Sequence, residues 1–251
     1  MQAMILAAGL GTRLQPLTND RPKAMVEVAG RPLLEHIILK MKRQGFNRLV
    51  VNIHHFGQMI VDFLKANDNF GMDIRLSDER GLLLNIGGGV KKALELFDPN
   101  EPILIHNVDI ASDADLAALY REAQREVGQG SQPCGALLAT NSRATNRFLL
   151  FTHEGFLRGW LNEYSEGDKG KAMGNEPISE LERWPFTGIH VLTPALFEAL
   201  RDYPQEMFSI IDFYLSVCIE HPIKRTSLPA DCRWVDCGRV EALDEAGEIL
   251  G

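Results

Sequence analysis

The stretch MILAAGLGTRLQPLTNDRPKAM, residues 4–25, begins as a strand and then changes character. Met4 to Ala7 are apolar without alternation, which is typical of a parallel strand that is covered on both faces. The following residues are rich in glycine and proline and carry the cations Arg13 and Lys23, so they cannot form a core. The stretch therefore predicts a buried strand whose carboxyl end opens into a polar loop.

The composition indicates a globular protein and excludes several classes of partner. With 251 residues, 45% of them hydrophobic and 24% charged, the chain can bury a sizeable core. A net charge of −8 argues against nucleic acid and anionic membrane as partners, so a phosphate ligand needs a local basic cluster. The sequence has no bilayer-spanning apolar run, no signal-peptide pattern and no CxxC pair among its 4 cysteines, which predicts a reduced, cytoplasmic protein. Its oligomeric state is left open.

Apolar runs alternate with helical patterns through the first half of the chain. RLVVNI at 48–53 and PILIHN at 102–107 read as buried strands, and PLLEHIILKMKRQGF at 32–46 reads as a one-faced helix. This order predicts an α/β fold with a mixed, mainly parallel sheet, helices on both faces, and ligands at the carboxyl ends of the strands. Further along, 128–133 predicts a flexible break, later strand patterns predict antiparallel members of the sheet, and 163–184 predicts a long polar loop.

Two glycine-rich segments can approach a ligand closely. Gly9 to Leu14 matches neither familiar phosphate loop, because leucine replaces the third glycine of the dinucleotide fingerprint and the Walker lysine is absent. Its small residues still permit close approach of a base or phosphate, with Arg13 and Lys23 at the same strand end; the alternative is a solvated surface loop. The triplet Gly87 to Gly89 predicts a helix that opens with unpaired N–H groups; the alternative is a turn that needs positive φ.

Two aspartates end apolar strand patterns and are candidate ligands for a metal. Asp109 follows ILIHNV and Asp236 follows WV, and one or two carboxylates plus substrate phosphates are a typical Mg²⁺ environment. Asp113 and Asp115 are instead assigned to the start of a helix, because Ser112 to Asp115 has the spacing of a capping box. The alternative for Asp109 and Asp236 is that each is a salt-bridged surface acid.

These residues together carry a resemblance to a known family. ILAAGLGTRLQPLTNDRPKAMVEVAGRPLLEH at 5–36 resembles the signature of sugar-1-phosphate nucleotidyltransferases, especially N-acetylmuramate-1-phosphate uridylyltransferase and mannose-1-phosphate guanylyltransferase-like enzymes. The resemblance continues through the glycine triplet and through ILIHNVD, GWLNE, FTGIHVL and WVDCG. It implies the Rossmann-like nucleotide-diphospho-sugar transferase fold with three α/β/α layers. It also implies a single domain, with a nucleotide-binding half at 1–127 and a sugar-phosphate-binding half at 128–251.

The resemblance implies a reaction and a role for each matching residue. An NTP and a sugar 1-phosphate would give an NDP-sugar and pyrophosphate, with Arg13 and Lys23 on the departing phosphates and Asp109 and Asp236 on Mg²⁺. Arg13, Lys23 and Asp109 would be catalytic. The residues implied to contact the nucleotide are Leu6, Ala7, Ala8, Gly9, Gly11, Thr12, Gly87 and Gly88. The residues implied to contact the sugar phosphate are Asn162, Glu163, Gly188, Arg143 and Arg147.

Three departures from the family pattern leave the substrates open. Val108 replaces a usual glycine, Asn85-Ile86 replaces an acid and a threonine, and Arg239 adds a cation after Gly238. Uridylyl transfer to an amino-sugar or hexose 1-phosphate is the first hypothesis, and guanylyl transfer to mannose 1-phosphate is the second. A nucleotide-sugar sensor without turnover is a third hypothesis, and a nicotinamide-dependent oxidoreductase is disfavoured by Leu14.

Overall fold

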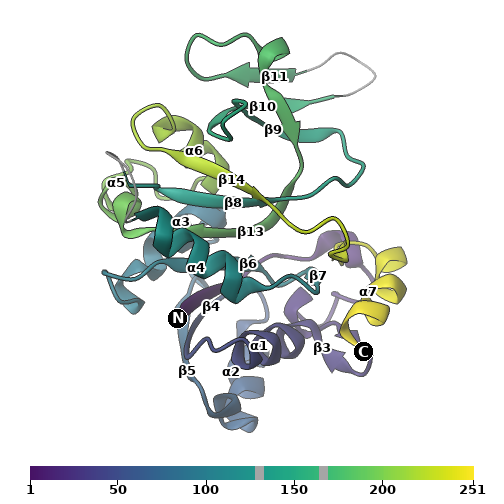
Figure 1. The fold of residues 1–251 in the computed structure, drawn as a ribbon. Coiled ribbons are helices and arrows are strands. Elements are labelled where there is room, and N and C mark those ends of the chain that lie inside the picture. Colours follow the sequence, from purple (N-terminus) through teal and green to yellow (C-terminus); the bar gives the residue numbers. More distant parts are fainter. Residues whose placement is uncertain (128–132, 164–168) are drawn as a thin grey trace.

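The centre of the molecule is a seven-stranded sheet with the order β14–β8–β13–β6–β1–β4–β5 (Figure 1). The computed structural model describes residues 1–127, 133–163 and 169–251. Neighbouring strands pair in parallel except at β13, which runs antiparallel to both β6 and β8, so the expected mainly parallel sheet is confirmed. The strands are β1 (Gln2–Leu6), β4 (Arg48–Ile53), β5 (Asp73–Asp78), β6 (Ile103–Asn107), β8 (Ala136–Thr140), β13 (Phe186–Leu192) and β14 (Ile223–Ser227).

Helices cover both faces of this sheet and make the expected three layers. One face carries α1 (Leu33–Arg43), α2 (Gly57–Ala66), α4 (Leu116–Val127) and α7 (Leu243–Leu250). The other carries α3 (Asn85–Ala93), α5 (Phe197–Arg201) and α6 (Ile210–Val217). Successive residues of β1 serve the two cores in turn, since Ala3 and Ile5 pack in the first and Met4 in the second. No helix in the described part of the chain is long and apolar enough to cross a bilayer.

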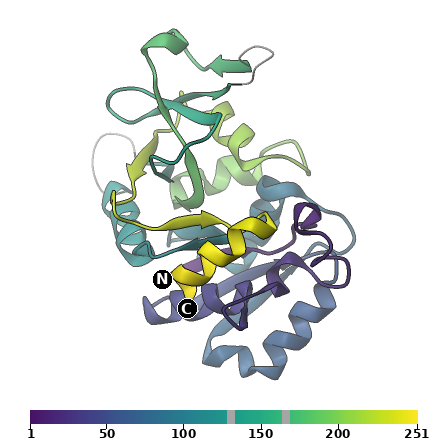
Figure 2. The same cartoon turned by 90° about the vertical axis from the view of Figure 1, so that its right-hand side faces the viewer.

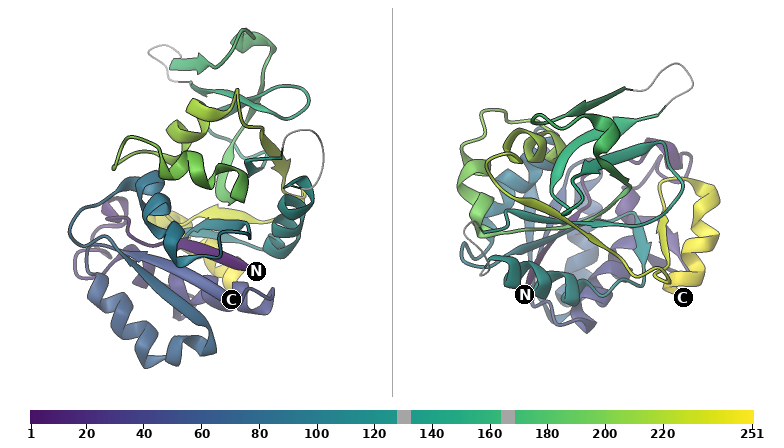
Figure 3. Two further views of the ribbon diagram at one scale, coloured as in Figure 1. Left: turned by 90° about the vertical axis from the view of Figure 1, so that its left-hand side faces the viewer. Right: turned by 45° about the horizontal axis from the view of Figure 1, so that its top comes forward.

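A separate antiparallel sheet stands over the main one and corrects two expectations. It has the order β11–β10–β9–β12 and lies at the top of Figure 1 and of both views in Figure 3. Its strands are β9 (Arg147–Phe151), β10 (Leu157–Asn162), β11 (Lys169–Ala172) and β12 (Glu182–Trp184). The antiparallel strands after 140 therefore do not all join the main sheet, and 163–184 is not a single loop. Residues 128–132 of the predicted break and 164–168 lie outside the described residues.

The last part of the chain returns to the first half. β15 (Trp234–Asp236) pairs antiparallel with β7 (Ile110–Ser112), with Asp236 opposite Ile110. α7 then packs against β7 and against the short hairpin of β2 (Glu27–Val28) and β3 (Arg31–Pro32), as Figure 2 shows. This return brings a segment from the far end of the sequence to the strand that follows Asp109.

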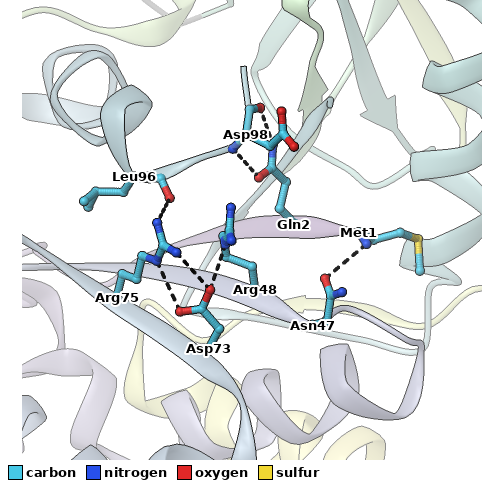
Figure 4. Close-up of polar contacts among 8 residues, drawn as sticks. All are labelled: Met1, Gln2, Asn47, Arg48, Asp73, Arg75, Leu96 and Asp98. Atoms are coloured by element: carbon cyan, nitrogen blue, oxygen red, sulfur yellow. Dashed lines mark hydrogen bonds and ion pairs between the residues drawn. The ribbon is translucent and has the colours of Figure 1, made fainter. Parts of the chain in front are cut away.

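Polar contacts fasten the amino ends of three neighbouring strands (Figure 4). In β1, Gln2 donates from Nε2 to the Asp98 carbonyl at 2.9 Å. Arg48 of β4 pairs with Asp73 of β5 at 2.8 Å, and Arg75 pairs with the same carboxylate at 3.2 Å. The opposite, carboxyl edge of these strands is the edge that carries the cavity described below.

The start of α4 confirms one capping assignment and corrects the other. Asp115 accepts a hydrogen bond from the Ala118 backbone N–H at 2.8 Å and therefore caps the helix. Asp113 does not serve the helix start; it accepts from the backbone N–H of Arg233 at 2.9 Å and pairs with that guanidinium. The sequence could not show this partner, because Arg233 lies far along the chain beside β15.

Candidate functional site

A cavity of about 290 Å³ opens at the carboxyl ends of β1, β4 and β6. Its walls come from the loop after β1, from the segment between β5 and α3, and from the ends of these three strands. The lining residues are Leu6, Ala8, Gly9, Gly11, Thr12, Arg13, Lys23, Asn52, Glu79, Leu83, Asn85, Ile86, Asn107, Val108, Asp109 and Gly238. The opening stretch of the sequence therefore builds one wall of the cavity, as its position after a buried strand predicted.

The loop after β1 folds back so that its two cations reach the same strand end. Gly11 has φ of 68°, and its carbonyl accepts a hydrogen bond from the Thr18 hydroxyl at 2.9 Å. A Cβ at Gly11 would lie 3.1 Å from the Lys23 Cβ, so both the backbone angle and the close contact favour glycine. Arg13 and Lys23 both line the cavity as a result.

A buried polar pair braces the floor of the cavity. Asn52 accepts hydrogen bonds at Oδ1 from the backbone N–H groups of Ala7 at 2.7 Å and Ala8 at 3.2 Å. Its Nδ2 donates to Glu79 Oε1 at 2.7 Å, and the other Glu79 oxygen accepts from the Leu84 N–H at 3.2 Å. Glu79 is only 1% exposed, so this carboxylate is held by the fold itself. The sequence analysis missed Glu79, although it ends a strand pattern as Asp109 does.

The glycine triplet has a different place from the one expected. α3 begins at Asn85, so the three glycines lie inside its first turns and are buried. Gly87 donates its N–H to the Phe208 carbonyl at 2.9 Å, which corrects the expectation of unpaired N–H groups at this residue. A Cβ on Gly87 would overlap the Phe208 ring, and one on Gly88 would overlap the Glu206 carbonyl oxygen. These glycines permit close packing against 206–208, and Asn85 and Ile86 line the cavity in their place.

Asp109 and Asp236 reach neighbouring parts of the same edge. Lys23 and Asp109 form an ion pair, with side chains only 9% and 17% exposed. The carbonyl of Asp109 accepts from the Cys237 N–H at 2.7 Å, which ties the residue after β15 to the residue before β7. Asp236 accepts at Oδ1 from the Gly238 N–H at 2.8 Å. The structure thus places the backbone segments that carry these two aspartates side by side, although the sequence separates them widely.

These carboxylates fit a hard divalent cation such as Mg²⁺. Across residues 1–127, 133–163 and 169–251, no group of 3 or more His, Cys, Asp or Glu side chains is arranged to hold a metal. Mg²⁺ is commonly held by one or two carboxylates, with phosphate oxygens and water in the remaining positions. Asp109 in the cavity wall and Asp236 in the adjoining hollow offer the one or two carboxylates of that pattern.

A second hollow, which we call the arginine groove, adjoins the cavity at Arg13 and has a volume of about 1090 Å³. Its lining residues are Arg13, Gln15, Arg143, Thr145, Arg147, Trp234, Asp236, Arg239, Val240, Glu241, Ala242 and Glu245. Gly238 lies between the two hollows, and a Cβ there would lie 2.7 Å from both Arg13 Nη2 and Asp236 Oδ1. The absence of a side chain at Gly238 therefore lets the guanidinium and the carboxylate approach the same backbone.

A third hollow of about 520 Å³ lies between β9, β10 and α6. It contains three of the residues expected to contact the sugar phosphate, Asn162, Arg143 and Arg147. Asn162 Oδ1 is buried and has no hydrogen-bond partner among the described residues. Arg143 stacks over Trp234 at 4.4 Å and donates to the Phe186 carbonyl at 2.7 Å, and burial lowers the pKa of its guanidinium.

The other two expected sugar contacts do not line any of these three hollows. Glu163, at the end of β10, forms an ion pair with Arg183 of β12. Gly188 of β13 is buried with φ of 78°, and a Cβ there would lie 2.7 Å from Asn107 Nδ2. The lack of a side chain at Gly188 thus leaves room for the side chain of Asn107, which lines the cavity.

Two curated proteins that share a name are among the relatives of this chain. N-acetylmuramate alpha-1-phosphate uridylyltransferase from Caulobacter vibrioides is 46% identical over 43% of this chain and 45% of the relative. The protein of the same name from Neisseria meningitidis serogroup B is 38% identical over 49% of this chain and 53% of the relative. The matches thus span about half the length of these curated relatives.

A solved structure and a family model extend the comparison to the whole chain. HddC from Yersinia pseudotuberculosis, complexed with GMP-PN, superposes with a TM-score of 0.73 over 98% of both chains at 21% identity, which shows a shared fold. The family model described as Nucleotidyl transferase matches residues 2–250. The chain therefore belongs to the nucleotidyl transferase family.

Proposed function

We propose that the protein transfers a nucleotidyl group from an NTP to a sugar 1-phosphate and releases pyrophosphate. The observation that carries the proposal is the cavity itself, in which glycine backbone, Arg13, Lys23 and Asp109 meet at the carboxyl edge of a parallel sheet. Ligands of doubly wound α/β folds bind at this edge. The match of the family model to residues 2–250 supports the same reaction class.

The reaction needs positioning and charge compensation and no protein nucleophile. A phosphate oxygen of the sugar phosphate attacks the α-phosphorus, the bond from that phosphorus to the bridging oxygen breaks, and pyrophosphate departs with the electron pair. The backbone from Leu6 to Gly9 would lie under the nucleotide, and Arg13 would neutralise the departing phosphates. Lys23, now paired with Asp109, would share its charge between that carboxylate and the phosphates.

Asp109 and Asp236 would hold Mg²⁺ in this scheme. When bound, the ion supplies Lewis-acid charge compensation at the phosphate oxygens. The pairing of β15 with β7 sets the position of one carboxylate relative to the other, and the Cys237 hydrogen bond to Asp109 fixes that register. Gly87 and Gly88, which were expected to contact the nucleotide, would act through the packing of α3 against 206–208. Asn85 and Ile86, which line the cavity, would face the ligand.

The proposed substrates are a uridine nucleotide and an amino-sugar or hexose 1-phosphate, with N-acetylmuramate 1-phosphate first. The uridylyltransferases from Caulobacter and Neisseria support this choice. The hollow beside β10 supports an anionic sugar phosphate, because Arg143 and Arg147 line it. The buried, unpartnered oxygen of Asn162 in the same hollow is an acceptor and would suit a sugar hydroxyl. Glu163 would join this site only after leaving Arg183.

The test is pyrophosphate release with Mg²⁺ from UTP, GTP, dTTP, CTP and ATP, each against N-acetylmuramate, mannose, glucose and N-acetylglucosamine 1-phosphates. We expect one preferred pair, with UTP as the nucleotide. Preference for GTP with mannose 1-phosphate would replace the proposed substrates and keep the reaction. Nucleotide binding without turnover in the whole panel would refute the reaction and favour a sensor, with Asn85, Ile86 and Val108 as the first positions to revert.

A further inference from the structure

The arginine groove carries two cations that the fold does not use. Arg13 and Arg239 are both exposed, and within the described ranges neither side chain has an ion pair or hydrogen bond. Arg143, in the same groove, is engaged by the Trp234 ring and by a backbone carbonyl. In a chain of net charge −8, two unpaired guanidinium groups at one hollow make a local site for an anion.

The position of Arg239 ties it to the reaction cavity. It follows Gly238, which lines the cavity, and the preceding Cys237 is fixed by its hydrogen bond to the Asp109 carbonyl. Arg13 lines both the cavity and the groove, and its guanidinium lies directly against Gly238. An anion that leaves the cavity past Arg13 therefore enters the groove that Arg239 lines.

We propose that Arg239 and Arg13 together bind the pyrophosphate released by the reaction and guide it out of the cavity. Pyrophosphate has several charged oxygens on two phosphorus atoms, and guanidinium groups bind such oxygens through paired, charge-assisted hydrogen bonds. One phosphate would remain on Arg13 at the edge of the cavity while the other reaches Arg239. The inference rests on the proposed function, since pyrophosphate is its product.

The acidic side chains of the groove limit how tightly the product is held. Glu241 and Glu245 line the same hollow, and Asp236 lies beside Gly238 as Arg13 does, so three carboxylates also act on an anion in the groove. The groove therefore combines two unpaired guanidinium groups with three carboxylates. This arrangement favours brief binding and release of pyrophosphate over storage.

The direct test is isothermal titration calorimetry with sodium pyrophosphate on the wild-type protein and three variants. Arg239→Gln should weaken binding about tenfold, the loss expected for one charge-assisted contact, and Arg239→Lys should fall between the two. Arg201→Gln is the matched control, because Arg201 is also exposed and unpartnered in the described structure but lines none of these hollows. No pyrophosphate binding to the wild type, or equal weakening in Arg201→Gln, would overturn the proposal.

Kinetics separates this role from a role in sugar recognition. Arg239→Gln should raise the inhibition constant of pyrophosphate about tenfold and leave the KM of the sugar phosphate unchanged. A raised KM for a carboxylate-bearing sugar phosphate, with pyrophosphate inhibition unchanged, would refute the proposal and assign Arg239 to the sugar. If the wild type releases no pyrophosphate from any NTP, the proposed function fails, and the calorimetric result decides separately whether the groove binds this anion.

Discussion

The hydrogen bond between Asn52 and Glu79 beneath the cavity can be tested by exchanging the amide and the carboxylate between the two positions. In the wild type, Asn52 donates to Glu79 and accepts from the backbone of Ala7 and Ala8. Asn52→Asp keeps the acceptors for Ala7 and Ala8 but places a second carboxylate against Glu79. Adding Glu79→Gln restores a donor between the two positions, with the amide oxygen still able to accept from Leu84.

The size of the effect follows from the cost of two buried carboxylates in contact. Charges about 4 Å apart in an effective dielectric of about 20 repel by about 4 kcal/mol. Protonation of one carboxyl at pH 7 relieves the repulsion, and raising a pKa from about 4 to about 7 also costs about 4 kcal/mol. Asn52→Asp should therefore lower the free energy of unfolding by about 3–4 kcal/mol, and the double variant should recover at least about 2 kcal/mol.

Urea unfolding followed by circular dichroism measures all four proteins of this double-mutant cycle. The deficit of Asn52→Asp should also shrink as the pH falls towards about 4, because a proton then occupies the shared site at less cost. A double variant no more stable than the sum of the single effects would refute the exchange. It would mean that Asn52 and Glu79 are not coupled through the contact at 2.7 Å.

Three further predictions concern the site and the core. Asp109→Asn and Asp236→Asn should each reduce Mg²⁺-dependent turnover at least about 10²-fold in a pyrophosphate-release assay, because each would remove one of the two carboxylates proposed to hold the metal. Gly238→Ala should lower kcat about tenfold in the same assay, since a Cβ would lie 2.7 Å from the neighbouring guanidinium and displace it. Burial lowers the pKa of His106 and His190 to about 3, so between pH about 6.5 and 3 the unfolded chain binds protons that the folded chain does not. As the pH is lowered through this range, the free energy of unfolding should fall by about 1.4 kcal/mol per pH unit for each histidine. Urea unfolding of His190→Phe at several pH values should show a pH slope smaller by that amount.

Each of these three has a contrary outcome. Full turnover in both Asn variants, with unchanged thermal melting, would remove Asp109 and Asp236 from the metal site. Unchanged kcat in Gly238→Ala would show that the guanidinium has room to move without loss. Equal pH slopes for wild type and His190→Phe would show that this imidazole takes up a proton in the folded state.

The sequence predicted the parts of the molecule that depend on neighbours along the chain. Local periodicity and turn residues predicted a strand at 4–7, a helix within 32–46 and the loop with Arg13 and Lys23. The structure places the strand at Gln2–Leu6, the helix at Leu33–Arg43 and the two cations at the cavity. The ion pair of Lys23 with Asp109 joins two of the predicted residues. The three-layer arrangement follows in the same way, because unbroken apolar strands must be covered on both faces.

The sequence could not predict contacts whose partners come from distant segments. The packing role of Gly87 and Gly88 depends on the loop at 206–208, and the pairing of Asp113 depends on Arg233. β14 was missed because only the first of its residues, IKRTS, is apolar, so the segment does not look like a buried strand. The ion pair between Glu163 and Arg183 likewise depends on the separate antiparallel sheet.

The late return of β15 to β7 has a consequence for protein synthesis. β1, β4, β5 and β6 can pair as soon as the first half of the chain has left the ribosome, and they already build most of the cavity wall. Asp236 arrives only with β15, after every strand of the main sheet. A polypeptide that ends before β15 would therefore have most of the cavity wall and would lack the second carboxylate. If the proposed transfer needs both carboxylates, activity would appear only after β15 has been synthesised, in a single late step of translation.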